Sequence, residues 1–187
     1  MATSNDFRNG MALNVDGNLV TIVDFQHVKP GKGGAFVRSK LKNVVTGAVI
    51  ERTWRAGEKV EEVRLERAPM QYLYRDGADY HVMDQETFEQ FTLGEELFGD
   101  GAQFLKENEV VTVLLHEGKP LLAELPNFVL LQVASTDPGF RGNTAQGATK
   151  PAVLETGAEV QVPLFIDPGD MLKIDTRTGS YVERAKR

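Results

Sequence analysis

One lysine in the sequence stands apart because glycines surround it. Lys32 follows Pro30 and Gly31 and precedes Gly33 and Gly34 in the stretch KPGKGGAF. Glycine adopts tight-turn conformations without steric cost, so such a loop is slim and presents a single ammonium group at its apex. That amine is suited to binding phosphate or carbonyl groups, or to covalent modification. The residues alone leave another interpretation open, a plain hairpin end with a solvated lysine.

Further cations lie close to this loop in the sequence. Residues 29–42 contain five Lys or Arg residues and no Asp or Glu. Besides Lys32 they are Lys29, Arg38, Lys40 and Lys42. Positions 38, 40 and 42 alternate, which places them on one face of a β-strand. This face is suited to contacts with RNA phosphates, although a solvated strand face explains the same pattern.

The sequence shows no constellation typical of an enzyme. A P-loop needs Gly-Lys-Ser/Thr at the start of a helix, whereas a glycine and then a strand pattern follow Lys32. A dinucleotide fingerprint also requires a helix after its glycines. His27, His81 and His116 lie in separate strand patterns without metal-ligand spacing, and no Gly-x-Ser-x-Gly motif occurs. We therefore expect no enzymatic activity, no cofactor and no metal.

Composition and charge limit the class of protein further. The 187 residues are 41% hydrophobic and include no cysteine, which excludes disulfides and thiolate metal sites. No apolar run is long enough to cross a bilayer and no signal-peptide pattern is visible, so we expect a cytoplasmic protein without membrane contacts. The net charge is uneven: +3 for residues 1–64, −9 for 65–128 and zero for 129–187. A basic first third suits RNA, and an acidic middle must be held away from it or lie against cationic protein.

Short strand patterns separated by glycine turns run along the whole chain. Examples of such turns are Asp16-Gly17, Asp76-Gly77 and Glu117-Gly118. Only residues 84–91 and 93–105 have a helical pattern, and both stretches are short. Many short strands with few helices predict an all-β protein. The strand pattern is interrupted near Pro69 and near Pro126, and the net charge changes along the chain in three segments. Both observations favour three small β-barrels, covering residues 1–64, 65–127 and 128–187.

The last third contains a long polar loop at residues 135–151. Long ordered loops are often functional, although a floppy surface loop is the alternative.

Several long segments together resemble bacterial elongation factor P over the whole chain. KPGKGGAF resembles the family's most distinctive segment, with Lys32 at its apex. QYLYRDGADYHVMDQETFEQ is similar to the family's second domain. DPGFRGNT, KPAVLETGAEVQVPLFIDPGD and IDTRTGSYVERA resemble the third.

This resemblance implies a fold and a function. The fold is an L-shaped molecule with an SH3-like first domain and two OB-fold domains. Family members bind the 70S ribosome between the peptidyl and exit sites, beside the P-site peptidyl-tRNA, and relieve stalling at consecutive prolines. Lys32 then approaches the CCA end of the tRNA, while nearby cations contact tRNA or ribosomal RNA. The resemblance also implies a cytoplasmic monomer, and an enzyme that modifies Lys32 in those members that carry a modification.

The resemblance assigns the third domain to tRNA and the small subunit. The expected contact residues are Arg141, Gly142, Asn143, Thr144, Lys150, Tyr181 and Arg184. Many members have aspartate where this chain has Asn143, so contacts of that residue with the exit-site codon carry over only in part. At the tip, family members use bare lysine, a lysine carrying a lysine-like or aminopentanol group, or an arginine carrying a sugar. The lysine of this chain disfavours the arginine branch.

Two other functions stay open on the residues. An OB-fold protein that binds single-stranded RNA needs aromatic stacking platforms, but aromatic residues make up only 8% of the chain and Trp54 is the single tryptophan. A paralogue of the same family, acting on a different set of stalled messages, is the second alternative.

Overall fold

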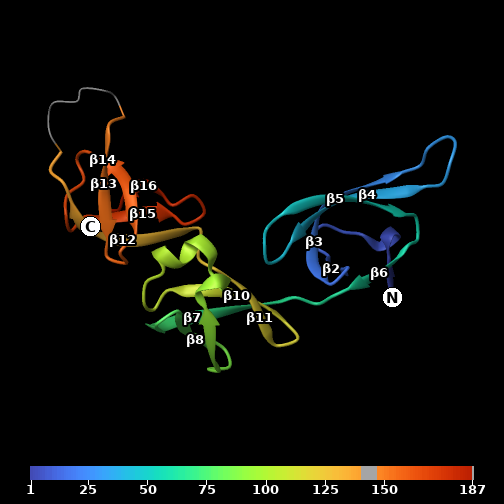
Figure 1. Cartoon of the computed structure of the whole chain (residues 1–187), viewed down its shortest axis with the longest axis horizontal. Helices are drawn as coiled ribbons and strands as arrows, with labels where there is room; N and C mark the ends of the chain where they lie inside the picture. Colours follow the sequence, from blue (N-terminus) through green and yellow to red (C-terminus); the bar gives the residue numbers. More distant parts are fainter. Residues whose placement is uncertain (140–146, 187) are drawn as a thin grey trace. The chain divides into compact units, whose positions relative to one another are not determined.

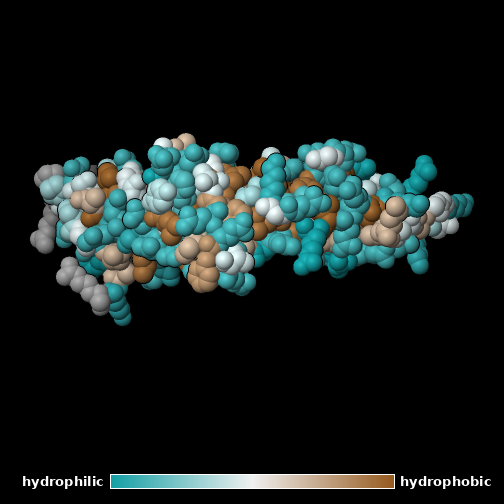
Figure 2. All heavy atoms as spheres, turned by 90° about the horizontal axis from the view of Figure 1, so that it is seen from below, coloured by the Kyte–Doolittle hydropathy of each residue, from teal (hydrophilic) through white to brown (hydrophobic). Residues whose placement is uncertain are grey.

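The computed structural model describes residues 1–139 and 147–186, and over these it is almost entirely β-structure (Figure 1). The strands form three sheets, two of them curled like barrels, which confirms the predicted all-β class. Within the described residues no helix is long and apolar enough to cross a membrane. The face drawn in Figure 2 is mainly hydrophilic, with hydrophobic atoms scattered over it, as expected when the apolar side chains fill the cores.

The first sheet is built around one long hairpin. Its strand order is β1-β6-β2-β3-β4-β5. Side chains of β4 alternate between buried and exposed, and the buried set packs into a core with Phe7, Leu13, Ile22 and Trp54. This alternation is the period-two pattern of a strand with one buried face. The strands are β1 (Ala2–Thr3), β2 (Ala12–Val15), β3 (Asn18–Val28), β4 (Phe36–Asn43), β5 (Val49–Arg55) and β6 (Lys59–Glu62), with a 3₁₀ turn η1 (Ser4–Asp6).

The second sheet has the strand order β11-β10-β7-β8-β9. Its apolar side chains include Met70, Val82, Leu93 and Val111, all fully buried. The elements are β7 (Glu66–Asp76), β8 (Asp79–Asp84), β9 (Gln90–Gly94), β10 (Val110–His116) and β11 (Lys119–Glu124), with two 3₁₀ segments, η2 (Glu95–Leu97) and η3 (Gly99–Phe104).

The third sheet has the strand order β14-β13-β12-β15-β16. Its core also contains Phe104, which comes from η3 and packs with the apolar residues of this sheet. A Cβ at Gly179 would lie 3.3 Å from the Phe104 ring, so glycine leaves room for it. The strands are β12 (Phe128–Thr136), β13 (Thr149–Leu154), β14 (Glu159–Pro163), β15 (Met171–Asp175) and β16 (Ser180–Arg184).

The chain forms two compact units. One comprises Met1–Arg67 and Leu114–Leu122, and the other comprises Ala68–Val113 and Ala123–Arg187. Phe104 ties the second unit together, because this aromatic ring belongs to the core of the third sheet. The domain boundaries predicted at residues 64 and 127 stay predictions.

The helical prediction for residues 84–91 is wrong, and the one for 93–105 is met only by the short segments η2 and η3. The Asp84 carboxylate accepts hydrogen bonds from the backbone N–H groups of Glu86 and Thr87, at 2.7 and 3.0 Å. Phe88 then takes a positive φ of 59°. A side chain that bonds its own backbone in this way stabilises a turn in place of a helix.

Candidate functional site

The loop that carries Lys32 lies at the end of the longest hairpin in the first unit. Strands β3 and β4 pair from Val20 with Asn43 to Val28 with Phe36, and the chain between them projects from the barrel (Figure 1). All residues from Lys29 to Ala35 are exposed. Gly33 has a φ of +115°, a conformation that side-chain-bearing residues rarely adopt. The hairpin therefore presents Lys32 to solvent, where its ammonium group can meet a partner.

Buried contacts beneath the hairpin hold β4 in place. The Trp54 indole N–H donates to the Ser39 hydroxyl at 2.8 Å, and that hydroxyl in turn donates to the Arg52 carbonyl at 3.3 Å. Ser39 is only 1% exposed, so this polar chain is shielded from water. The Trp54 ring packs edge-on against Phe7, with ring centroids 5.5 Å apart. A fully satisfied buried network of this kind rigidifies the strand that leads to the loop.

The outer face of β4 carries Arg38, Lys40 and Lys42, all exposed, as the alternation of the sequence indicates. Cross-strand pairing places Asp24 and Glu51 directly opposite Lys40, on β3 and β5. Residues 29–42 contain no acid, but this face of the sheet does, because β3 and β5 each add one carboxylate.

The residues directly opposite the other two cations are uncharged. Arg38 pairs with Gln26 and Thr53, whereas Lys42 pairs with Thr21 and Val49. The sheet also places Arg55 on this face, since it pairs with Phe36. Sequence analysis did not single out Arg55, because only the register of β4 against β5 brings it to this face.

The predicted third-domain contacts have different surroundings. Arg141, Gly142, Asn143 and Thr144 lie outside the described residues. Lys150 is described and only 7% exposed, and its ammonium donates to the Asp137 carbonyl at 2.6 Å. The structure thus directs this ammonium to the protein's own backbone, where it joins β13 to the segment that follows β12.

Tyr181 and Arg184 share a pocket of about 620 Å³ in the second unit with Phe165 and Lys186. The Arg184 guanidinium lies 5.3 Å from the centroid of the Phe165 ring and 3.7 Å from the Asp170 carboxylate. Phe165 is 58% exposed. Sequence analysis indicated Tyr181 and Arg184 but not Phe165. The exposure of the Phe165 ring is the feature that identifies it, and only the structure shows that exposure. An aromatic ring beside cations suits a nucleotide.

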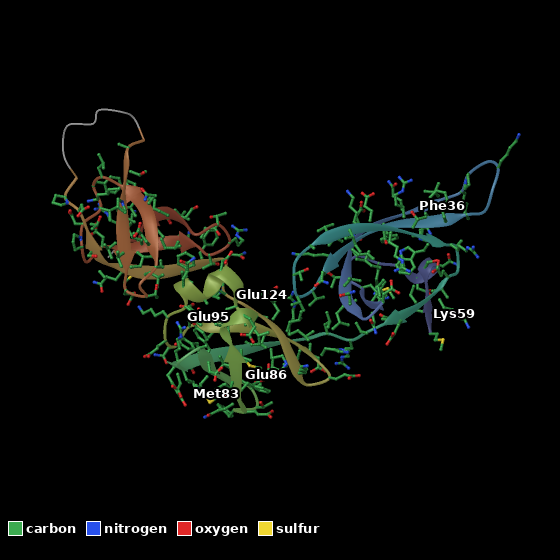
Figure 3. All side chains as sticks on the ribbon, in the orientation of Figure 1. Phe36, Lys59, Met83, Glu86, Glu95 and Glu124 are labelled. Atoms are coloured by element: carbon green, nitrogen blue, oxygen red, sulfur yellow. The ribbon has the colours of Figure 1, made fainter. Side chains whose placement is uncertain are left out.

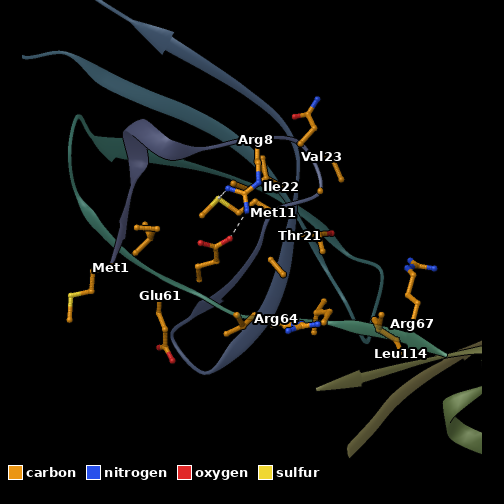
Figure 4. Close-up of a pocket in the computed structure, with 18 residues that line it drawn as sticks. Met1, Arg8, Met11, Thr21, Ile22, Val23, Glu61, Arg64, Arg67 and Leu114 are labelled. Atoms are coloured by element: carbon orange, nitrogen blue, oxygen red, sulfur yellow. Dashed lines mark hydrogen bonds and ion pairs between the residues drawn. The ribbon is translucent and has the colours of Figure 1, made fainter. Parts of the chain in front are cut away.

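A larger pocket of about 1170 Å³ lies in the first unit, lined by residues of β2, β3 and β6 (Figure 4). The Arg8 guanidinium, which lines it, donates to the Glu62 carboxylate at 2.6 Å. The pocket residues do not include any of the tip residues 29–34. The lining also contains Glu61, Arg64 and Arg67, so charges of both signs are mixed, and we assign no chemistry to this pocket.

Several side chains of the second unit have shifted pKa values, and each shift has a structural cause. Burial raises the pKa of the Tyr72 and Tyr80 hydroxyls. Backbone hydrogen bonds from Thr87 and Glu86 lower the pKa of Asp84. The hydrogen bond from the Arg177 side chain lowers the pKa of Asp175. These carboxylates stabilise turns, and their low pKa values are not those of a general acid.

Three family models match the chain in order. They are the elongation factor P KOW-like domain over residues 3–60, the elongation factor P OB domain over 65–123 and the elongation factor P C-terminal domain over 129–184.

Individual proteins match along almost their full length. Elongation factor P of Acetivibrio thermocellus is 55% identical over 184 residues, which are 98% of this chain and 100% of that protein. Elongation factor P of Moorella thermoacetica is 58% identical over 185 residues, 99% of this chain and 100% of that protein. A solved structure of eukaryotic translation initiation factor 5A from Methanococcus jannaschii shares the fold, with a TM-score of 0.52 and 24% identity over 67% of this chain and 90% of that one. With three family models in order and more than half of the residues identical to these relatives, the chain belongs to the elongation factor P family.

Proposed function

We propose that this translation elongation factor binds the 70S ribosome between the peptidyl and exit sites and directs Lys32 toward the CCA end of the P-site peptidyl-tRNA. There it stimulates peptide-bond formation when the nascent chain stalls on consecutive prolines. The observation that carries the proposal is the exposed glycine hairpin, in which Gly33 has a φ of +115° and Lys32 lies at the end of a rigidly supported strand pair.

The shape of the loop suits a narrow, RNA-lined cleft. Gly31 precedes Lys32, and Gly33 and Gly34 follow it. A Cβ built at Gly31 or Gly34 would meet nothing within 4 Å. The loop itself is therefore thin and does not pack against the barrel. A slim backbone with one cation at its end can approach nucleic acid phosphates without side-chain collisions.

Lys32 contributes positioning and makes no bond to the reacting groups. Proline reacts slowly in peptide-bond formation because its backbone is conformationally restricted. A peptidyl-prolyl-tRNA therefore often departs from the geometry that nucleophilic attack requires. A cation and a fixed backbone beside the CCA end restrict this movement and lower the entropic part of the barrier. Lys29, Arg38 and Lys42 provide cations around the tip for tRNA or ribosomal RNA phosphates.

The third sheet serves as a second tRNA contact, near the small subunit. The pocket of Tyr181, Arg184 and Phe165 offers an aromatic ring and a guanidinium to a nucleotide. Arg141, Gly142, Asn143 and Thr144 complete this contact in the proposal. The Lys150 ammonium donates to the Asp137 carbonyl, so this residue contributes to the contact by joining β13 to the segment after β12.

We further propose that the factor acts as a cytoplasmic monomer. Lys32 is exposed on a projecting loop, so it is accessible to a modifying enzyme. Intact-mass spectrometry of the native protein, followed by mapping of the peptide around Lys32, shows whether it is modified.

The test of this function is the Lys32→Ala variant in a translation system with polyproline reporters. Because the variant loses the positioning cation, we expect polyproline synthesis to slow about tenfold to a hundredfold. Messages without consecutive prolines should be translated at the wild-type rate, and the melting temperature should not change. Polyproline synthesis at the wild-type rate would show that Lys32 does not have this role.

A further inference from the structure

The outer face of β3, β4 and β5 is arranged in rows that the register defines. From the tip inward, the first row is Val28, Phe36 and Arg55, and the second is Gln26, Arg38 and Thr53. The third row is Asp24, Lys40 and Glu51. Phe36, labelled in Figure 3, lies at the end of β4 next to the tip loop. Arg55 therefore lies closer to the tip than Arg38 does.

The backbone hydrogen bonds of Arg55 show which type of pair this residue forms with Phe36 of β4. Its N–H donates to the Glu58 carboxylate at 2.9 Å, and its carbonyl accepts from the Ser4 hydroxyl at 2.6 Å. Both backbone groups thus point away from β4, so Arg55 and Phe36 form a non-hydrogen-bonded pair. In such pairs the side chains lie closer together than in hydrogen-bonded ones. Arg38 is the diagonal neighbour of Arg55, at a Cα separation of about 7–8 Å, within reach of two long side chains.

The charges of Arg38 and Arg55 are not neutralised within the described part of the chain. Neither guanidinium forms an ion pair there. The Glu58 carboxylate accepts the hydrogen bond from the Arg55 backbone. Asp24 and Glu51 are also diagonal to Arg38, but neither makes an ion pair with it. Two cations so close together raise the local positive potential, which an anion between them relieves.

Lys40 differs from Arg38 and Arg55 in the charge of the residues that face it, although it too forms no ion pair within the described residues. Asp24 and Glu51 face it directly from the two neighbouring strands, so this row has a net charge of −1. Opposite charges at facing positions attract each other across a sheet. A phosphate that approached Lys40 would be repelled by the carboxylates on both neighbouring strands.

We propose that Arg38 and Arg55 together bind one phosphate of an RNA backbone, while Lys40 neutralises Asp24 and Glu51 and contacts no phosphate. This inference rests on the proposed function, because it identifies the cations that hold the tip hairpin against ribosome-bound RNA. Guanidinium groups suit this role, since each can donate two parallel hydrogen bonds to phosphate oxygens. Thr53 and Gln26 add a hydroxyl and an amide in the same row as Arg38.

The experiment measures the affinity of the full chain for ribosomes that carry peptidyl-tRNA, at several salt concentrations. The variants are Arg38→Ala, Arg55→Ala and the double variant. Arg52→Ala is the matched control, because it removes an arginine from the same strand but from the opposite face, where Arg52 pairs with Asp16 at 3.0 Å. Thermal melting confirms that each variant is folded.

We expect Arg38→Ala and Arg55→Ala each to weaken binding about tenfold, and Arg52→Ala to leave it unchanged. The slope of log affinity against log salt should fall by about one in the double variant, because both arginines share one phosphate. An Arg55→Ala variant that binds like Arg52→Ala, with an unchanged slope, would overturn the site. If this site fails but Lys32→Ala loses polyproline synthesis in the translation system, the proposed function stands. Wild-type protein that does not bind ribosomes would overturn both.

Two further experiments test whether Lys40 contacts RNA and whether the arginine site binds free phosphate. A triple variant, Asp24→Asn with Lys40→Gln and Glu51→Gln, should bind ribosomes at least as tightly as wild type, whereas weaker binding would make Lys40 a contact and contradict the inference. Inorganic phosphate added to the ribosome-free chain should not saturate the arginine side-chain NMR signals below about 1 mM, because one phosphate held at an exposed surface binds weakly. Saturation below that concentration would assign the site to free phosphate and overturn the RNA proposal.

Discussion

Lys32 and Lys150 are lysines of the same chain that both adjoin turn-rich polar segments, yet their ammonium groups have opposite surroundings. Lys32 is exposed among glycines, on a loop that projects from the first barrel. Lys150 is 7% exposed at the start of β13, with its ammonium on the Asp137 carbonyl. Glycines provide no side-chain atoms to cover Lys32, whereas Lys150 lies on β13 opposite Val162 of β14 and reaches the backbone of Asp137. A lysine near a loop is therefore available to a partner only when its ammonium is not already bound by another group of the same chain.

The sharpest way to test this comparison is to make the same change at both lysines. Lys150→Met keeps an unbranched side chain but removes the ammonium and its hydrogen bond, so the free energy of unfolding should fall by about 1 to 3 kcal/mol. Lys32→Met should change it by less than about 0.5 kcal/mol, because an exposed loop side chain contributes little. Urea denaturation measures both values. Equal effects on stability in the two variants would remove the distinction between the lysines.

The tip itself can be disturbed through its backbone. Gly33→Ala places a Cβ at a φ of +115°, which costs about 1 to 2 kcal/mol unless the loop rearranges. We expect slower polyproline synthesis, since a rearranged loop displaces Lys32. Gly34→Ala is the control, because Gly34 has no positive φ and a Cβ there meets nothing within 4 Å. Equal polyproline rates in both variants would mean that the shape of the loop is unimportant.

The smallest expected effect concerns acid stability in the second unit. Asp175 has a lowered pKa because of the Arg177 side chain, which donates to it at 2.9 Å. A carboxylate with a folded-state pKa below its unfolded value stabilises the fold above the unfolded pKa, and this contribution disappears as the pH falls through the folded pKa.

Asp175→Ala should therefore be less stable than wild type at pH 6, and the difference should shrink as the pH falls below 3.8, the ordinary pKa of an aspartate side chain. Urea denaturation across this range measures it. The tip provides the contrast, because residues 29–42 contain no carboxylate and Lys32→Met should show no such dependence. A stability difference for Asp175→Ala that persists unchanged at low pH would contradict the pairing with Arg177.

Local pattern was sufficient for the features that depend on neighbouring residues. The Asp16-Gly17 turn joins β2 to β3, where Asp16 has a φ of 53° and Gly17 of 84°. The alternation of β4 correctly placed Arg38, Lys40 and Lys42 on one exposed face. The helical prediction for residues 84–91 was wrong because the Asp84 side chain competes with the helix for backbone N–H groups, a preference that periodicity does not report.

By itself, the sequence determined the all-β class, the glycine tip with Lys32 and the membership of the elongation factor P family. Only the tertiary structure decided which residues become neighbours: Asp24 and Glu51 face Lys40, Arg55 is diagonal to Arg38, and the Lys150 ammonium donates to the Asp137 carbonyl. The physical reason is strand register. A turn is specified by the few residues within it, whereas the residues that face each other across a sheet are far apart in sequence and are brought together by the length of the hairpin and the packing of the core.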